Sequence, residues 1–459
     1  MRRRRRLRVT AAAVLLLAVA AATVIVVHRG GFASSLSSAH VETSAPPVPV
    51  GVAPKIHAVA ANAPVPVPAA LGAVLSPLAG ASALGTLTGR VADPESGAVL
   101  WDADSAKPQL PASTAKVLTV AAALLTLDTA GVVHTKVVAG TVPGQIVLVG
   151  GGDPTLSAAP PGAPEHYPGA ARLDDLVAQV RSSGVAVSSV VVDTSAYSGD
   201  TLASGWFAAD IGGGSIAPIE PVMLDGARSD PMQEDPPRSG TPALDVGRAL
   251  AARLGVSARA VSAGRAGADA RVLADVSSAP LSVRLEQLML ASGDVLTETV
   301  GREVALARGL PVTFAGAAAA VAAALTDAGV DVSGLTMSDT SGLSVLDRAP
   351  ARVLTDVLTK AAADGPHGAA LRPLLSMLPV AAASGTLTDR FGRAAAQPGA
   401  GWVRAKTGSL SGVNSLAGIV TDVDGRVLVF ALLSNGSDAG AARPALDAIA
   451  AALRTCGCR

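Results

Sequence analysis

The chain has 459 residues, of which 49% are hydrophobic, so it is long enough for two or three domains and can build a buried core. Its formal net charge is zero, but six of the first eight residues are Arg, which leaves 30 basic and 36 acidic residues in the rest of the chain. An acidic body argues against a nucleic-acid-binding protein, and we expect no nucleic acid partner.

The N-terminus predicts a membrane anchor. The basic segment 1–8 precedes 19 uncharged, mostly apolar residues from Val9 to Val27, whereas a cleaved signal peptide usually has about 7 to 15 apolar residues. Because positive flanks stay in the cytoplasm, we expect a single-pass signal anchor over residues 9–27 with the catalytic body outside the cell membrane. The alternative is a long cleaved signal peptide, since small residues follow around Ala33, and the body would then be secreted.

Residues 28–80 are predicted to form a linker, because they are rich in Pro and Ala with few charges and no helical period. The two cysteines, Cys456 and Cys458, lie at the C-terminus, so the fold does not depend on a disulfide framework. Both a local disulfide and two free thiols agree with their spacing. The six histidines show no paired metal spacing, and we expect no metal and no other cofactor.

Strand patterns stand at both ends of the body, and helical patterns lie between them. Residues 87–101 alternate around a DPESG turn and predict a β-hairpin, and residues 110–125 predict a helix. Three strands and a final helix are predicted over residues 401–408, 413–423, 426–434 and 443–454. We therefore expect one α+β domain over 81–140 and 276–459, whose sheet uses both ends of the chain, with an inserted accessory region over 141–275.

A serine and a lysine stand three residues apart in the stretch PASTAK, at Ser113 and Lys116. Lysine is scarce in this chain, with six Lys against 30 Arg. Residues three apart share one face of a helix. Serine becomes a good nucleophile when a base takes its proton, and a buried lysine can be that base, whereas arginine does not deprotonate in proteins. The spacing of Ser113 and Lys116 fits a catalytic serine with its lysine base. It also fits the commoner case of two solvated side chains on a helix surface.

A second lysine stands in a similarly suggestive stretch, WVRAKTGSLSG. Lys406, Thr407, Gly408 and Ser409 follow one another at the end of a predicted strand. A strand edge with a cation, a hydroxyl and a glycine can bind a carboxylate and lies open to an extended peptide. These residues are therefore predicted to bind substrate.

The stretches PASTAK and KTGS resemble, in this order, the first and third motifs of the penicillin-recognising serine enzymes. LVGGGDPTL, DTSGLSVLDR, ASGTLTDRF and the large insert narrow the resemblance to the D-alanyl-D-alanine carboxypeptidase/endopeptidase family, the class C low-molecular-mass penicillin-binding proteins. The resemblance covers about residues 85–452. It implies a penicillin-binding, serine β-lactamase-like transpeptidase domain, in which helices flank an antiparallel sheet.

The same resemblance implies the reaction. Ser113 would be the acylated nucleophile, Lys116 its general base, and Ser292 a relay for the proton that the leaving amine takes up. The implied activity is that of a serine D,D-carboxypeptidase, with endopeptidase activity on cross-links as an addition. The implied partners are peptidoglycan stem peptides ending in D-Ala-D-Ala, and β-lactam antibiotics as acylating inhibitors.

Substrate-binding roles follow from the third motif. The resemblance implies that Lys406 and Thr407 bind the terminal carboxylate of the peptide or of a β-lactam, beside the unobstructed backbone of Gly408. The backbone N–H groups of Ser113 and Ser409 would form the oxyanion hole, in which one donor typically contributes about 10² to 10³ in rate.

The middle motif departs from the family pattern. S-x-N is expected, but the aligned residues are Ser292, Gly293 and Asp294, and no S-x-N occurs in the chain. An Asn amide donates a hydrogen bond to the substrate carbonyl, whereas an ionised Asp only accepts. Asp294 would instead pair with Lys116 and weaken it as a base, so we expect acylation at a reduced rate. The contrary expectation is that a small backbone shift accommodates Asp294 and the rate changes little.

Two other functions agree with parts of the sequence. A catalytically impaired penicillin-binding or wall-binding scaffold is supported by Asp294 alone. A secreted serine β-lactamase would share the motifs, but the anchor, the linker and the large insert disfavour it.

Overall fold

The computed structural model describes residues 63–233 and 235–458. The basic segment 1–8, the anchor over 9–27 and the linker up to residue 62 lie outside the described residues, so they stay predictions. Within the described part of the chain, no helix is long and apolar enough to cross a membrane.

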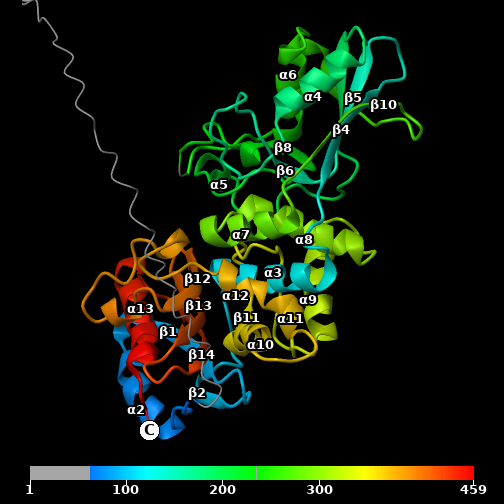
Figure 1. Ribbon diagram of the computed structural model, residues 1–459. Coiled ribbons are helices and arrows are strands. Elements are labelled where there is room, and N and C mark those ends of the chain that lie inside the picture. The colour runs from blue at the N-terminus through cyan, green and yellow to red at the C-terminus, as the bar shows by residue number, and fades with distance from the viewer. Residues whose placement is uncertain (1–62, 234, 459) are drawn as a thin grey trace, which may run out of the picture. The chain divides into compact units, whose positions relative to one another are not determined.

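Both ends of the body contribute to one five-stranded sheet, as the sequence predicts. The strand order is β12-β13-β14-β1-β2, and each neighbouring pair is antiparallel (Figure 1). The predicted hairpin is the pair β1 and β2, and the three strands predicted near the C-terminus are β12 to β14. The strands span Thr86–Ala92 (β1), Val99–Ala103 (β2), Val403–Leu410 (β12), Val413–Thr421 (β13) and Val427–Asn435 (β14).

Strand β14 is buried on both faces, which explains its continuous apolar run. Phe430 and Leu432 belong to the core beneath α13 (Ala439–Thr455), which is the helix predicted at the C-terminus. Ala431 and Leu433 belong to the core on the opposite face, where α10 (Ala351–Ala362) packs on the strand. The sheet therefore separates two hydrophobic cores, with α13 and α10 on opposite sides (Figure 1).

Helix α2 (Pro68–Ala79) shows that the predicted linker is wrong over its last residues. Leu71 and Leu75, one helical turn apart, are fully buried in the core shared with α13. Pro68 begins the helix, a position at which the missing N–H of proline costs nothing. The helix forms because it packs against α13, and a partner so distant in sequence cannot be read from a Pro-rich composition.

The predicted helix over residues 110–125 is present as a short 3₁₀ turn followed by a buried α-helix. The turn, η2 (Ala112–Ala115), leads directly into α3 (Lys116–Thr126). The helices around α3 form the layer that completes the second core. They are α7 (Leu281–Ala291), α8 (Asp294–Ala307), α9 (Phe314–Asp327), α11 (Gly368–Leu371) and α12 (Pro373–Met377).

The accessory region has its own five-stranded mixed sheet, in the order β10-β4-β5-β7-β9. Helices α4 (Leu173–Ser182) and α6 (Pro242–Arg253) contribute their apolar faces to its core. The strands span His134–Ala139 (β4), Gln145–Gly150 (β5), Ser189–Asp193 (β7), Val261–Ala263 (β9) and Val272–Ser277 (β10). A parallel pair, β6 (Asp153–Leu156) and β8 (Val222–Leu224), lies beside it, and α5 spans Ala209–Gly212.

The predicted limits of the insert, residues 141 and 275, need correction at both ends. Strand β4 precedes residue 141 yet pairs with β10, with His134 opposite Ser277. The accessory region therefore begins at β4 and ends with β10. A single strand carries no sign of the sheet to which it belongs, so the sequence placed β4 in the catalytic domain.

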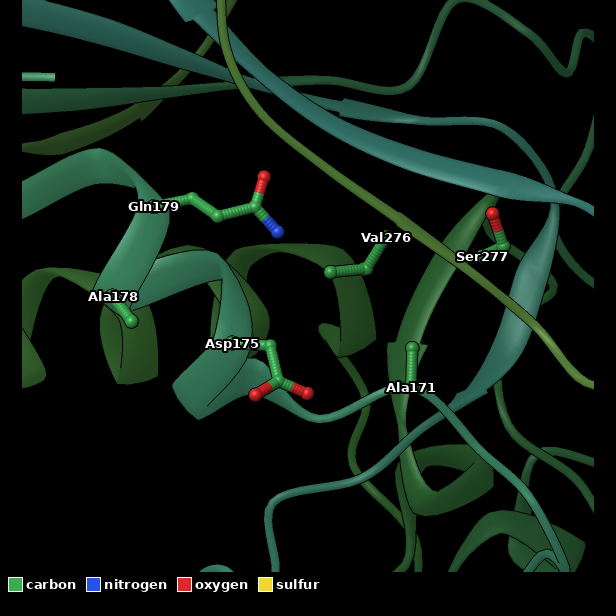
Figure 2. A pocket seen from close by; sticks show the side chains of 6 residues that line it. All are labelled: Ala171, Asp175, Ala178, Gln179, Val276 and Ser277. Carbon is green, nitrogen blue, oxygen red and sulfur yellow. The ribbon is translucent and has the colours of Figure 1, made fainter. Parts of the chain in front are cut away.

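A side chain binds one residue at the edge of the accessory sheet. Gln179 of α4 donates from Nε2 to the Asp275 carbonyl at 3.1 Å and accepts from the Asp275 N–H at 2.9 Å, which satisfies the backbone groups of this one residue on the edge strand. A cavity of about 460 Å³ lies beside this contact (Figure 2), lined by Ala171, Asp175, Ala178, Gln179, Val276 and Ser277. None of the predicted site residues lines it.

Short elements complete the description. They are η1 (Ser82–Leu84), β3 (Pro108–Gln109), η3 (Asp225–Ala227), η4 (Ala258–Ala260), β11 (Ala349–Pro350), η5 (Gly385–Leu387) and η6 (Gln397–Gly399). Cys456 and Cys458 are paired in a disulfide, one of the two states that the sequence left open.

Candidate active site

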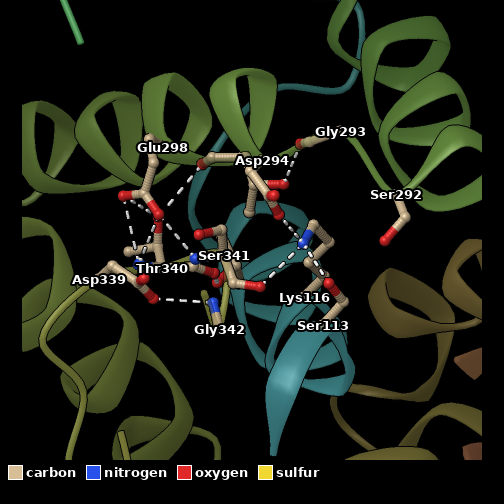
Figure 3. A network of polar contacts seen from close by, with 12 residues as sticks. Ser113, Lys116, Ser292, Gly293, Asp294, Glu298, Asp339, Thr340, Ser341 and Gly342 are labelled. Atoms are coloured by element: carbon tan, nitrogen blue, oxygen red, sulfur yellow. Dashed lines mark hydrogen bonds and ion pairs between the residues drawn. The ribbon is translucent and has the colours of Figure 1, made fainter. Parts of the chain in front are cut away.

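The first motif lies where η2 meets α3, and it places Ser113 and Lys116 in direct contact. Lys116 is fully buried, whereas Ser113 is half-buried. The Lys116 Nζ donates to Ser113 Oγ at 2.9 Å, to Asp294 Oδ1 at 2.5 Å and to the Ser341 carbonyl at 2.8 Å (Figure 3). The predicted contact between Asp294 and Lys116 is thus present.

The three partners of Lys116 differ in what they can do. A carboxylate and a carbonyl oxygen accept hydrogen bonds only, whereas a serine hydroxyl donates or accepts. A neutral amine has two hydrogens and one lone pair. If its hydrogens go to Asp294 and Ser341, the lone pair faces the hydroxyl of Ser113. The arrangement can therefore aim a lysine base at a serine proton.

The second and third motifs meet at Lys406. This side chain is fully buried, and its Nζ donates to Ser292 Oγ at 2.7 Å and to the Thr407 carbonyl at 2.9 Å. Burial, together with the positive charge of Lys116, lowers the pKa of Lys406 well below its usual value, and Asp294 acts in the opposite direction. Ser292 stands between α7 and α8 with φ 58°, a left-handed conformation that non-glycine residues rarely adopt.

The rest of the third motif lies along β12, the edge strand of the main sheet. Thr407 donates from Oγ1 to Thr386 at 2.8 Å, and Ser409 accepts from Arg443 of α13 at 3.0 Å. A Cβ at Gly408 would lie 2.8 Å from the Pro111 carbonyl, so only glycine lets this strand approach the loop before Ser113 so closely. The structure thus brings all eight predicted site residues to one region.

A model of the D-Ala-D-Ala carboxypeptidase 3 (S13) family matches residues 72–240 and 231–456. The chain belongs to this family. It is 50% identical over 416 residues to a carboxypeptidase of Mycobacterium tuberculosis, with 90% of each chain covered. It is 49% identical over 434 residues to the carboxypeptidase DacB of Mycolicibacterium smegmatis, with 93% of each chain covered. The predicted family and the predicted enzyme class, a serine-type D-Ala-D-Ala carboxypeptidase, are confirmed.

The fold is that of the penicillin-binding proteins, as predicted. The crystal structure of penicillin-binding protein 4 (dacB) from Haemophilus influenzae matches with a TM-score of 0.68 at 21% identity, over 82% of this chain and 97% of that one. A second structure of that protein, in complex with a β-lactam, matches with a TM-score of 0.64 at 20% identity, over the same shares. At these identities the likeness concerns the fold alone.

This S13 enzyme has a polar network behind Lys116, built around Glu298, a residue that the sequence did not single out. Asp294, Glu298 and Arg302 follow each other at intervals of four on α8, so they share one face of the helix. Glu298 accepts from the N–H groups of Thr340 at 3.0 Å and Ser341 at 2.8 Å (Figure 3). The spacing of acidic residues along a buried helix was the available signal.

Three buried carboxyl groups gather at this network. Burial and the charge of Asp339 raise the pKa of Glu298 to about 7. The same two causes raise the pKa of Asp347 to about 10, so Asp347 is neutral near pH 7. Asp339 is fully buried and accepts from the Gly342 N–H, the Ser344 N–H and Trp206 Nε1, each at 2.7 Å. These three donors fix the position of the Asp339 carboxyl group.

Proposed function

We propose that this protein is a serine D,D-carboxypeptidase that removes the terminal D-Ala of peptidoglycan stem peptides through an acyl-enzyme on Ser113. The observation that carries the proposal is the distance of 2.9 Å between Lys116 Nζ and Ser113 Oγ, with a second buried lysine, Lys406, in the same site. Membership of the S13 family and the names of the two mycobacterial relatives support it.

In the acylation step, the Ser113 hydroxyl gives its proton to the neutral amine of Lys116 while Oγ attacks the carbonyl carbon of the penultimate D-Ala. The C–N bond then breaks, and the terminal D-Ala leaves with a proton that Ser292 relays from the lysines. Water hydrolyses the ester and restores the Ser113 hydroxyl. The contact of Lys406 Nζ with Ser292 Oγ at 2.7 Å supports the relay.

Substrate binding falls to the third motif. Lys406 and Thr407 bind the terminal carboxylate of the peptide, since a buried cation is a strong partner for a carboxylate. The N–H groups of Ser113 and Ser409 hold the oxyanion, and Gly408 lets β12 lie close to the loop before Ser113. Asp294 borders the substrate, with a side chain 13% exposed.

We propose that β-lactams acylate the same serine. The Haemophilus penicillin-binding protein 4 was crystallised with a β-lactam, and the motifs of this chain agree with such binding. Ring opening releases no separate amine: the leaving nitrogen stays joined to the acyl group and keeps water from the ester, so the adduct persists. Intact mass after incubation with penicillin tests this, because a stable adduct is expected on the wild type and none on Ser113→Ala.

The peptidase proposal is tested by D-Ala release from a pentapeptide that ends in D-Ala-D-Ala. Turnover by the wild type, with none by Ser113→Ala, is the expected result. Wild-type turnover no faster than that of Ser113→Ala would overturn the proposal and favour the impaired scaffold. Rapid release of hydrolysed penicillin, with no lasting adduct, would favour a β-lactamase.

Endopeptidase activity and location are further parts of the proposal. Cleavage of a D-Ala-containing cross-link uses the same acyl-enzyme, and dimeric muropeptides test it directly.

The 19 uncharged residues from Val9 to Val27 support attachment to the cell membrane. Fractionation of the full chain tests this, with recovery in the membrane pellet expected. Recovery in the medium would favour a cleaved signal.

A further inference from the structure

The accessory region touches the active-site network at several places: Tyr197 lies against Arg302, and Trp206 reaches Asp339. Its segment 203–207 lies against the loop 338–345 of the catalytic domain. Trp206 donates from Nε1 to Asp339 Oδ2 at 2.7 Å, and Ser344 donates from Oγ to the Ser204 carbonyl at 2.7 Å. The half-buried indole also packs edge-on against Phe314, with ring centroids 5.2 Å apart.

Asp339 determines the shape of the loop. Its Oδ1 accepts from the Gly342 N–H and its Oδ2 from the Ser344 N–H, both at 2.7 Å. Gly342 has φ 83°, and a Cβ there would lie 2.0 Å from the Ala112 carbonyl. The loop is therefore pressed against the residue before Ser113, and its conformation depends on Asp339.

The loop in turn contacts the lysine of the first motif. The Ser341 carbonyl accepts from Lys116 Nζ at 2.8 Å and is one of the two acceptor-only partners that leave the lone pair facing Ser113 (Figure 3). A chain of contacts thus runs from Trp206 through Asp339 and Ser341 to Lys116. Displacement of the carbonyl would turn the lone pair away from the serine proton.

We propose that Trp206 and Asp339 are positioning residues for Lys116, so that the accessory region holds the base in its working orientation. This inference rests on the proposed function, in which Lys116 is the base. Neither residue touches the reacting atoms; both act through the Ser341 carbonyl. Trp206 supplies a neutral donor to a buried carboxylate, and its loss leaves one donor fewer on Asp339.

The test is Trp206→Phe, which removes the N–H and keeps a ring against Phe314. Trp402→Phe is the matched control, because Trp402 is 49% exposed and stacks on Arg454. We expect Trp206→Phe to lower kcat for D-Ala release and the rate constant of penicillin acylation by about tenfold, with KM changed less than twofold. Trp402→Phe should match the wild type in kcat, in KM and in the rate constant of penicillin acylation.

Asp339→Asn provides the second variant, since its single acceptor oxygen can replace Oδ1 or Oδ2 but not both. The variant therefore loses either the Gly342 N–H or the two donors on Oδ2, Trp206 and the Ser344 N–H. It should lower kcat at least as much, and the double variant Trp206→Phe/Asp339→Asn should lose no more than Asp339→Asn alone, because both changes act on one path.

Wild-type kcat in Trp206→Phe overturns the inference, as does a loss that is additive in the double variant. If Trp206→Phe lowers the melting temperature by several degrees and kcat falls only in step with the folded fraction, its role is structural and the inference fails. The proposed function fails separately, if the wild type shows no Ser113-dependent release of D-Ala and no penicillin adduct. This inference would then fall with it.

Discussion

Replacing Asp294 by Asn is the most informative change to the site, because it separates charge from orientation. In the wild type, the carboxylate oxygen accepts from Lys116 Nζ at 2.5 Å. Asn has an amide oxygen at the corresponding position, so it can still accept this hydrogen bond and hold the lysine. It removes the negative charge that favours the ammonium form of Lys116, and it adds an N–H that can donate to the substrate carbonyl.

The size of the effect follows from the contact. A hydrogen bond with one ionised partner, such as a lysine ammonium on an Asn amide, contributes about 1.5 to 3 kcal/mol, and a second ionised partner adds a charge–charge attraction that we take as about 1 to 2 kcal/mol. This additional attraction is what deprotonation of Lys116 must overcome in the wild type. Asp294→Asn should therefore acylate about 5 to 30 times faster. The KM should rise, because Asp294 also raises the pKa of Lys406 and so favours the cation that binds the carboxylate.

The assay is stopped-flow or quenched acylation by a labelled penicillin at several concentrations, which separates binding from the acylation rate constant. Asp327→Asn is the matched control, since Asp327 is exposed and pairs with Arg308 on the surface. Asp294→Ala removes charge and acceptor together, and should not gain the full rate of the Asn variant. An Asn variant that acylates no faster than the wild type would refute the reasoning.

Three further changes have defined outcomes. Ser113→Ala should abolish D-Ala release and the penicillin adduct while the melting temperature stays within a few degrees of the wild type, and turnover above background would remove Ser113 from the mechanism. Gly342→Ala should lower acylation at least about tenfold, because its Cβ meets the Ala112 carbonyl at φ 83°, whereas Gly425→Ala, at φ 88° with no atom within 4 Å, should acylate normally. Equal effects of the two Ala variants would leave only backbone strain as the cause. Glu298→Gln tests the buried carboxyl, whose pKa is raised from 4.5 to about 7. The free energy of unfolding of the wild type therefore falls as the pH rises between these two values, by up to about 3 kcal/mol, and the loss stays constant at higher pH. The free energy of unfolding of the Gln variant relative to the wild type should therefore increase from pH 5 to pH 8, and a constant difference would contradict it.

The sequence could predict those site residues whose partners lie close to them in the chain. Ser113 and Lys116 stand one turn apart, and Lys406 to Ser409 are consecutive, so spacing alone places them together within each motif. A single sheet made from both ends of the chain was accessible too, because strand patterns at both ends of the body needed partners, whereas the pairing of β1 with β14 in particular came from the structure. Helix α2 was missed for the opposite reason: Leu71 and Leu75 are stabilised by α13, far along the chain.

The network behind Lys116 shows the same limit within the site. Glu298 is on the helix that begins at Asp294, and the interval of four was visible in the sequence. Its partners, Thr340 and Ser341, are 42 and 43 residues away, and their N–H groups have no sequence signature. Trp206 is more distant still, 133 residues before Asp339. A side chain that binds backbone groups across the chain is found only from coordinates.

The charges in the site explain why Asp294 matters most when substrate is bound. Lys116 and Lys406 are both fully buried, and two buried cations repel each other, so one of them tends to lose its proton. Asp294 offsets one positive charge, and the carboxylate of the peptide or the β-lactam offsets the other. With both acids present, two lysines can stay protonated without excess charge, so the state with a free lone pair for the serine proton is less populated. With Asn at position 294, the substrate carboxylate offsets only one of the two lysine charges. The remaining positive charge favours the release of a proton from a lysine. The aspartate should therefore slow the acylation step while it supports substrate binding through Lys406, so the gain in Asp294→Asn belongs in the acylation rate constant.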